Sequence, residues 1–256
     1  MSPPPVAVAA RELGIALDQP ASVNDDAARR RIAEARPDMI CVVAFGALVR
    51  EPLLTEHPIR NVHPSLLPRW RGAAPIERAI MAGDEVTGVS IIQMTAGLDS
   101  GPVCAQGREP IRPEDTYDTL AARLAELGSD LLVHALDSSP PCEPQDEAAA
   151  TYAEKISAAD RKLDPRRTAA ELERTVRALT NHIGAYVELP DAMRLGVLKA
   201  RVRDADDHPP EGAVSLKGPL PVLGTADGAL ELVVVQPPGR RTMRGEDFLR
   251  GYRGKA

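Results

Sequence analysis

Apolar positions along the first half of the chain alternate between strand-like runs and helix-like patterns. Residues 39–45 (M-I-C-V-V-A-F) form a continuous apolar run, and its length and β-branched content predict a strand buried on both faces. Residues 116–136 place leucines on one side of a long amphipathic helix. Further strands are predicted at 89–94 and 103–111, and further helices at 6–13, 25–36 and 75–81. This alternation predicts an α/β domain with a mainly parallel sheet.

The second half has a different pattern. Residues 137–150 (D-S-S-P-P-C-E-P-Q-D-E-A-A-A) are rich in proline and acidic residues, lack an apolar period and are interpreted as a linker. Thr168-Ala-Ala-Glu171 matches a capping box that opens a helix to about Leu179. Short strands are predicted at 185–189, 195–202, 213–216, 221–223 and 230–235, before a last helix at 246–252. Their spacing predicts a small β-barrel, so we expect two domains, 1–136 and 151–256.

Composition is consistent with two packed domains and excludes several classes of protein. The chain has 256 residues, of which 43% are hydrophobic, enough for a folded core in each part. The three cysteines, Cys41, Cys104 and Cys142, are odd in number and form no C-x-x-C pair. Zinc and a disulfide framework are therefore disfavoured, and a reducing cytosol is expected. No signal peptide or transmembrane segment is visible, so we predict a cytoplasmic protein without membrane contact.

Charge is unevenly distributed. The net charge of −6 argues by itself against a nucleic-acid binder. Residues 1–150 carry 13 basic and 22 acidic side chains, whereas residues 151–256 carry 18 basic and 15 acidic ones, including all five lysines. A mildly basic second half suggests an anionic partner, although ordinary solvated surface charge explains it as well.

Two segments concentrate chemically useful residues. The first is 61–76 (N-V-H-P-S-L-L-P-R-W-R-G-A-A-P-I), which its prolines and glycine predict to be a shaped loop rather than a regular element. The second is G-L-D-S-G-P at 97–102, directly after the strand that ends at Met94. Because ligands bind at the carboxyl ends of strands in open parallel sheets, we expect both loops to open on the same edge.

Three side chains in these loops, Asn61, His63 and Asp99, supply complementary roles. Each has an ordinary explanation alone: an isolated histidine is usually structural, and an aspartate between glycines usually forms a turn. Together, an amide can donate to a developing oxyanion, an imidazole can take or give a proton, and a carboxylate can orient that imidazole and favour its charged form. The set suits transfer of an acyl group to an amine.

N-V-H-P-S-L-L-P followed by G-L-D-S-G-P, with this spacing, resembles the signature of the 10-formyltetrahydrofolate-dependent formyltransferases. The resemblance implies a Rossmann-like catalytic domain, 10-formyltetrahydrofolate as formyl donor and no metal. It implies that Asn61, His63 and Asp99 are the catalytic residues. The positions that it implies for folate binding are Phe45, Gly46, Ser65, Leu66, Leu67 and Pro68.

The longer form R-W-R-G-A-A-P-I-E resembles the members of this family that formylate methionyl-tRNA. Residues 145–156 and 234–249 resemble parts of the tRNA-contacting C-terminal domain of those members, which has an OB-like barrel. Initiator methionyl-tRNA, used in translation initiation, is then the expected acceptor of a monomeric enzyme. Its phosphates are expected to contact Lys155, Lys162, Arg166 and Arg167. A formyltransferase for a small amine, such as an amino sugar or purine precursor, and an inactive remnant that only binds folate or tRNA remain alternatives.

The sequence departs from this family pattern in two places. Family members begin with a buried strand, a helix and a loop, and this sequence is expected to start after them. Loss of a central strand would leave neighbouring strands unpaired, so we expect a weakly packed, N-terminally truncated first domain. N-H-I-G-A-Y at 181–186 also stands where relatives often have a proline-rich N-P-x-P-G-like segment.

Overall fold

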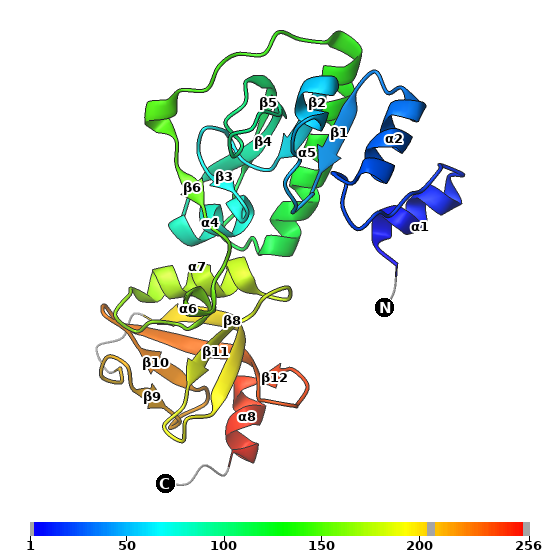
Figure 1. Ribbon diagram of the computed structural model, residues 1–256. Helices are drawn as coiled ribbons and strands as arrows, with labels where there is room; N and C mark the ends of the chain where they lie inside the picture. The colour runs from blue at the N-terminus through cyan, green and yellow to red at the C-terminus, as the bar shows by residue number, and fades with distance from the viewer. Residues whose placement is uncertain (1–2, 204–207, 253–256) are drawn as a thin grey trace.

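The computed structural model describes residues 3–203 and 208–252, which form two lobes joined end to end (Figure 1). The first lobe is built on a four-stranded sheet, and the second on a six-stranded sheet. A two-stranded sheet, formed by β3 (Arg71–Gly72) and β6 (Tyr152–Ala153), links the start of the second lobe to the first. Within this described part, no helix has the length and apolar character needed to cross a membrane.

The sheet of the first lobe confirms the α/β class but corrects its strand directions. Its order is β1-β2-β4-β5. The bounds are Ile40–Val43 for β1, Ile59–His63 for β2, Val86–Gln93 for β4 and Val103–Pro110 for β5. β1 and β2 are parallel, whereas β2–β4 and β4–β5 are antiparallel, so the expectation of a mainly parallel sheet is wrong for the residues described. Residues 94–102 are too few for the crossover that parallel neighbours require, so β4 and β5 form a hairpin.

Helix α5 (Tyr117–Ser138) covers this sheet and provides much of its core. It begins with a capping box at Thr116 and buries Leu120 and Leu124. Gly128 allows the helix to approach closely, because a Cβ there would lie 3.0 Å from Val62. Burial of each leucine contributes roughly 1.5–3 kcal/mol. The other helices of this lobe are α1 (Pro5–Glu12), α2 (Asp26–Ala35), α3 (Leu53–Glu56) and α4 (Pro75–Ala82).

β1 lies at one end of the described sheet order and has apolar surface open to solvent. Val43 at its end is 58% exposed and Phe45 is 43% exposed. Beside them is a groove of about 210 Å³. Its lining comprises Val23, Ile32, Ile40, Cys41, Val42, Val43, Phe45, Val49, Leu53 and Ile59.

The second lobe is an antiparallel sheet covered by α7 (Ala169–Leu179), which begins at the predicted Thr168 capping box. The strand order is β7-β8-β11-β10-β9, with β12 beside β11, and the sheet curls into a half-barrel. The strand bounds are Ala185–Glu188 for β7, Arg194–Arg203 for β8, Val214–Ser215 for β9, Val222–Gly224 for β10, Ala229–Gln236 for β11 and Met243–Arg244 for β12. The short helices are α6 (Ala158–Arg161) and α8 (Gly245–Gly251). The small β-barrel predicted for this part is a curled antiparallel half-barrel in the structure, and the last residues of the predicted domain, 253–256, lie outside the described part.

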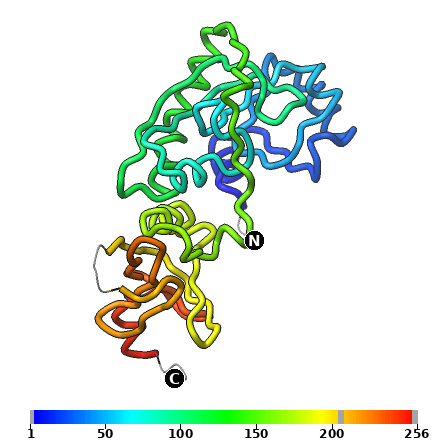
Figure 2. Tube along the Cα trace, turned by 90° about the vertical axis from the view of Figure 1, so that its left-hand side faces the viewer, coloured from blue at the N-terminus to red at the C-terminus, as the bar shows by residue number. Residues whose placement is uncertain are grey.

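The segment between the lobes is hydrogen-bonded to the first lobe rather than extending into solvent. α5 extends to Ser138, and Glu143 then exchanges two backbone hydrogen bonds of 2.8 Å with Val103. This pairing brings Cys104 and Cys142 into a disulfide, which the sequence analysis disfavoured. The pairing depends on a contact between distant segments, which cysteine spacing does not reveal. Figure 2 shows the chain descending along the side of the first lobe before entering the second.

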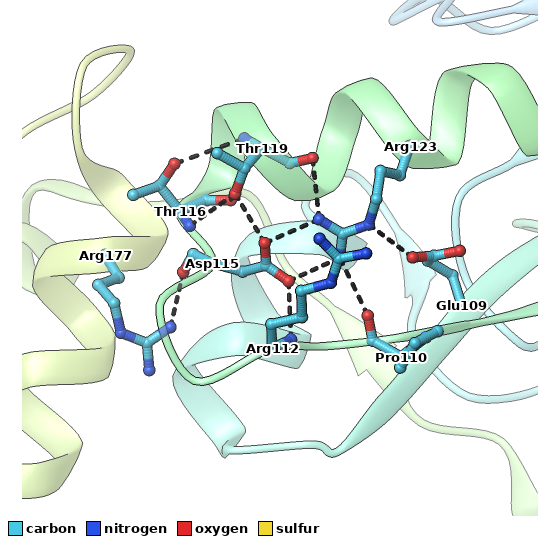
Figure 3. Close-up of polar contacts among 8 residues, drawn as sticks. All are labelled: Glu109, Pro110, Arg112, Asp115, Thr116, Thr119, Arg123 and Arg177. Atoms are coloured by element: carbon cyan, nitrogen blue, oxygen red, sulfur yellow. Dashed lines mark hydrogen bonds and ion pairs between the residues drawn. The ribbon is translucent and has the colours of Figure 1, made fainter.

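A buried polar cluster around Asp115 joins the two lobes (Figure 3). Arg123 pairs with the Asp115 carboxylate at 2.6 Å, and Arg177 of α7 donates to the Asp115 carbonyl at 2.6 Å. Burial would raise the pKa of Asp115, but hydrogen bonds from the Arg123 guanidinium, the Arg112 N–H and the Thr119 hydroxyl lower it to about 2. The ionised carboxylate therefore stabilises the folded chain.

We predict that Asp115→Asn lowers the melting temperature at neutral pH by about 2–8 °C, since it weakens the pairing with Arg123. The carboxylate has a folded pKa of about 2 and an ordinary value of 3.8, so its contribution is present above about pH 4 and is lost as pH falls towards 2. Thermal melts across this range should show a flatter acid decline for Asp115→Asn than for the parent chain. Asp130→Asn, on the exposed side of α5, is the control, and equal acid profiles for the two variants would contradict the assignment.

Candidate active site

The sequence predicts a loop at Asn61 and His63, but both residues lie on strand β2. β2 is paired on both sides, with β1 through Val62 and Val43 and with β4 through Val62 and Ile91. Alternate residues of a strand point to the same face, so Asn61 and His63 lie side by side on one face of the sheet. The loop begins at Pro64.

The turn between β4 and β5 brings Asp99 to these two residues. The Asn61 Nδ2 atom donates to Asp99 Oδ1 at 3.5 Å, and His63 Nδ1 lies 3.6 Å from Asp99 Oδ2. The Gly72 N–H donates to the same Oδ2 at 2.9 Å. The structure therefore brings together an amide and an imidazole from strand β2 and a carboxylate from the β4–β5 turn.

The orientation of His63 is fixed by a backbone carbonyl. The ring is only 4% exposed, and its Nε2 atom lies 2.9 Å from the Trp70 carbonyl oxygen. A carbonyl oxygen can only accept, so the hydrogen-bond network assigns the proton to Nε2. Nδ1, which faces Asp99, is then the nitrogen that can take up a further proton.

The segment Trp70–Gly72 has an unusual backbone that makes these contacts possible. Trp70 has φ of 64° and Gly72 has φ of 117°, both in the region that favours glycine. The Trp70 indole donates to Asp84 at 2.8 Å. A Cβ on Gly72 would lie 2.8 Å from the Ala153 carbonyl oxygen, so only glycine allows β3 to pair closely with β6.

The loop predicted to contact folate is supported from within. Ser65 is fully buried, and its hydroxyl donates to the Arg69 carbonyl at 2.6 Å. Ser90 donates to the Ser65 carbonyl at 2.7 Å and accepts from the Leu67 N–H at 3.1 Å. The Ser65 hydroxyl and the Leu67 N–H therefore stabilise the conformation of the loop, and the side chains of both residues are buried.

The remaining predicted folate positions are more accessible. Leu66 and Pro68 are half-buried on the loop, and Phe45 and Gly46 are exposed after β1. A Cβ added to Gly46 would meet no atom within 4 Å. Leu66, Pro68 and Phe45 thus retain solvent-accessible apolar surface.

The four cations predicted to contact tRNA differ in their surroundings. Lys162 pairs with Glu188 at 2.5 Å, Arg166 with Asp164 at 2.7 Å and Arg167 with Glu171 at 3.4 Å. Lys155 instead lines a cavity of about 370 Å³ between the lobes. The other residues lining this cavity are Ala73, Ala74, Glu77, Ile156, Ser157, Ala158, Arg161 and Ile183.

Other groups around the site were not predicted from the sequence. The Trp70 carbonyl and the Gly72 N–H act through the backbone, which residue type does not reveal. Gln145 contacts the Asp99 turn from residues interpreted as a linker. In the described ranges, 3–203 and 208–252, no cluster of three or more His, Cys, Asp or Glu side chains could hold a metal ion.

Comparison with known proteins is consistent across sequence and structure. The Formyl transferase family matches residues 1–136, and the Formyl transferase C-terminal domain matches residues 155–253. A methionyl-tRNA formyltransferase of Cereibacter sphaeroides is 43% identical over 98% of this chain and 82% of its own length. The corresponding protein of Halorhodospira halophila is 40% identical over 99% of this chain and 83% of its own length.

Solved structures share the fold at low sequence identity. HypX from Aquifex aeolicus superposes with a TM-score of 0.70 and 19% identity, over 94% of this chain and 46% of that one. Methionyl-tRNA formyltransferase from Clostridium thermocellum gives a TM-score of 0.58 at 16% identity, over 68% of this chain and 76% of that one. The fold is thus a mixed α/β domain followed by an antiparallel half-barrel domain. With the family matches and the relatives above, the chain belongs to the formyl transferase family.

We predict that Gly72→Ala destabilises the first lobe by about 1–3 kcal/mol, because the added Cβ meets a backbone oxygen and the positive φ becomes strained. Gly239→Ala is the matched control, since Gly239 has φ of 69° but no neighbour within 4 Å of an added Cβ. Thermal melts and hydrogen exchange of residues 70–74 are the measurements. A Gly72→Ala melt equal to that of Gly239→Ala would show that the close β3–β6 approach is not required.

Proposed function

We propose that this protein transfers a formyl group from 10-formyltetrahydrofolate to the amino group of methionyl-tRNA. The observation that carries the proposal is the meeting of Asn61, His63 and Asp99, with Asn61 and His63 each within 3.6 Å of the Asp99 carboxylate. A relative that is a methionyl-tRNA formyltransferase matches 98% of the chain, which supports the same donor and acceptor here.

Each residue of the trio has one role in the transfer. As the amine nitrogen attacks the formyl carbon, the carbonyl oxygen gains negative charge, which the Asn61 amide stabilises by donating a hydrogen bond. The amine must lose a proton, and His63 Nδ1 is placed to accept it because Nε2 is already bound to Trp70. The Asp99 carboxylate stabilises the resulting imidazolium. The bond to the donor nitrogen then breaks, and the proton is returned to that nitrogen.

The loop after β2 suits the folate donor. Leu66, Pro68 and Phe45 offer apolar surface to a flat ring, and Gly46 leaves open space beside it. Ser65 and Leu67 contribute by holding the loop in shape. When bound, the donor supplies the activated formyl group.

The acceptor contacts are proposed for the second lobe. Lys155 lines the cavity between the lobes, where a phosphate near the acceptor end of the tRNA can reach it. Lys162, Arg166 and Arg167 form exposed ion pairs. Such pairs contribute only about 0–1 kcal/mol, so phosphates can replace their carboxylates.

We further propose that the enzyme is a cytoplasmic monomer.

We predict that Asn61→Ala, His63→Ala and Asp99→Ala each lower the rate of formyl transfer about 100-fold or more, since each removes a group that acts mainly in the transition state. Single-turnover formylation of methionyl-tRNA, with folate binding measured separately, checks this. His134→Ala, which removes an exposed imidazole on α5, is the control. Near-normal rates for Asn61→Ala would contradict its role, and preferential formylation of a free amino sugar would contradict the proposed acceptor.

We predict that Lys155→Ala raises the KM for methionyl-tRNA several-fold and lowers the slope of log KM against log salt by about 1, because one phosphate contact is lost. Steady-state formylation at several salt concentrations measures both effects. Lys217→Ala, in an exposed loop far along the second lobe, is the matched control. Equal salt slopes for the two variants would place Lys155 outside the tRNA contact surface.

A further inference from the structure

We propose that Gln145 is a positioning residue that holds the Asp99 turn in its working geometry. The Gln145 Nε2 atom donates to the Asp99 carbonyl and to the Gly101 carbonyl, both at 2.7 Å. One amide thus bridges both sides of Ser100 in the turn between β4 and β5. Gln145 lies far along the chain, in the segment that joins α5 to β6.

The orientation of the Gln145 amide is dictated by Arg71. The Arg71 Nε and Nη2 atoms donate to Gln145 Oε1 at 3.0 and 2.9 Å. A guanidinium only donates, so Oε1 must face Arg71 and the NH₂ group must face the turn. Arg71 is only 2% exposed, and it also donates to both carboxylate oxygens of Glu147 at 2.8 Å.

The Asp99 turn has a backbone that needs such support. Asp99 has φ of 45°, a conformation that residues with a Cβ populate sparsely. The turn also packs closely against β4, since a Cβ on Gly101 would lie 1.8 Å from the Gln93 carbonyl oxygen. The turn is therefore held both by β4 and by the Gln145 side chain.

Three residues, Arg71, Gly72 and Gln145, together hold the backbone and the carboxylate of Asp99, and we call this group the clasp. Arg71 orients Gln145, and the next residue, Gly72, donates its N–H to the Asp99 carboxylate at 2.9 Å. Gln145 itself follows a backbone pairing of Glu143 with Val103, which fixes the segment beside β5. Loss of the Gln145 amide would free the turn to move, and the 3.6 Å separation of Asp99 and His63 would lengthen.

The catalytic consequence rests on the proposed formyl transfer. In Gln145→Met, which replaces the amide by a thioether of similar length, we expect kcat to fall about 10- to 100-fold, as small misplacements of a catalytic group do. KM for methionyl-tRNA should change by less than about three-fold, because Gln145 acts through Asp99 rather than on the substrate. The kcat of Gln145→Glu should fall by a similar factor, because this change places a carboxylate oxygen against the carbonyl oxygens of Asp99 and Gly101. Gln236→Met, which deletes an exposed amide in the second lobe, should keep the parental kcat.

A double-mutant cycle separates positioning from general stability. In an Asp99→Ala background, Gln145→Met should cause no further loss of kcat, because its target is already absent. Full additivity of the two losses, or a kcat for Gln145→Met and Gln145→Glu within about two-fold of the parent chain, would overturn the proposal.

A measurement that needs no activity tests the clasp by itself. Hydrogen exchange of residues 97–102 should be faster in Gln145→Met and Gln145→Glu than in the parent chain and in Gln236→Met. Unchanged exchange there would overturn the inference even if the parent chain formylates methionyl-tRNA. A different outcome is that the parent chain transfers no formyl group but exchange of 97–102 is faster in the two Gln145 variants. The proposed function would then be wrong, whereas the role of Gln145 in holding the turn would be supported.

Discussion

The carboxylate of Asp99 is the group on which the arrangement of the site depends. It lies between the Asn61 amide, the His63 ring and the Gly72 N–H. A partly buried carboxylate is costly unless donors satisfy it, and the Asn61 amide and the Gly72 N–H supply hydrogen bonds that hold β2 and β3 to the turn. The strand β2, the short β3 and the β4–β5 turn therefore adopt one relative position, and the chemistry follows from it.

Much of the secondary structure could be predicted because its signals are local. The capping box at Thr168 and the leucine face of 116–136 correctly predict α7 and α5. The sequence does not predict strand β2, because 59–63 lies between two prolines and carries polar residues at Asn61 and His63. Pairing with β1 and β4 outweighs those weak local preferences, as tertiary context commonly does for strands.

The antiparallel direction of β4 and β5 follows from the short 94–102 turn, which is itself readable from the sequence. What could not be predicted is non-local: the pairing of Cys104 with Cys142 depends on Glu143 meeting Val103. Composition makes 137–150 resemble a flexible linker, because proline and acidic residues report solvent exposure rather than backbone pairing. Asn61, His63 and Asp99 can be proposed from the sequence because side-chain chemistry is visible there, whereas the carbonyl and N–H contacts from Trp70 and Gly72 are not.

The same non-local contacts couple the lobes to the chemistry. Before the chain enters the second lobe, Thr151 accepts from the Trp70 N–H at 2.9 Å, and Ala153 accepts from the Ala73 N–H at 2.8 Å. The entry to the second lobe is thus bonded to the residues that orient His63 and Asp99. Arg78 adds an ion pair to Asp160 at 2.8 Å across the same junction. An acceptor bound by the second lobe would therefore lie at a fixed position relative to Asn61, His63 and Asp99. The fold itself would then offset part of the entropy cost of bringing the amine and the formyl group together.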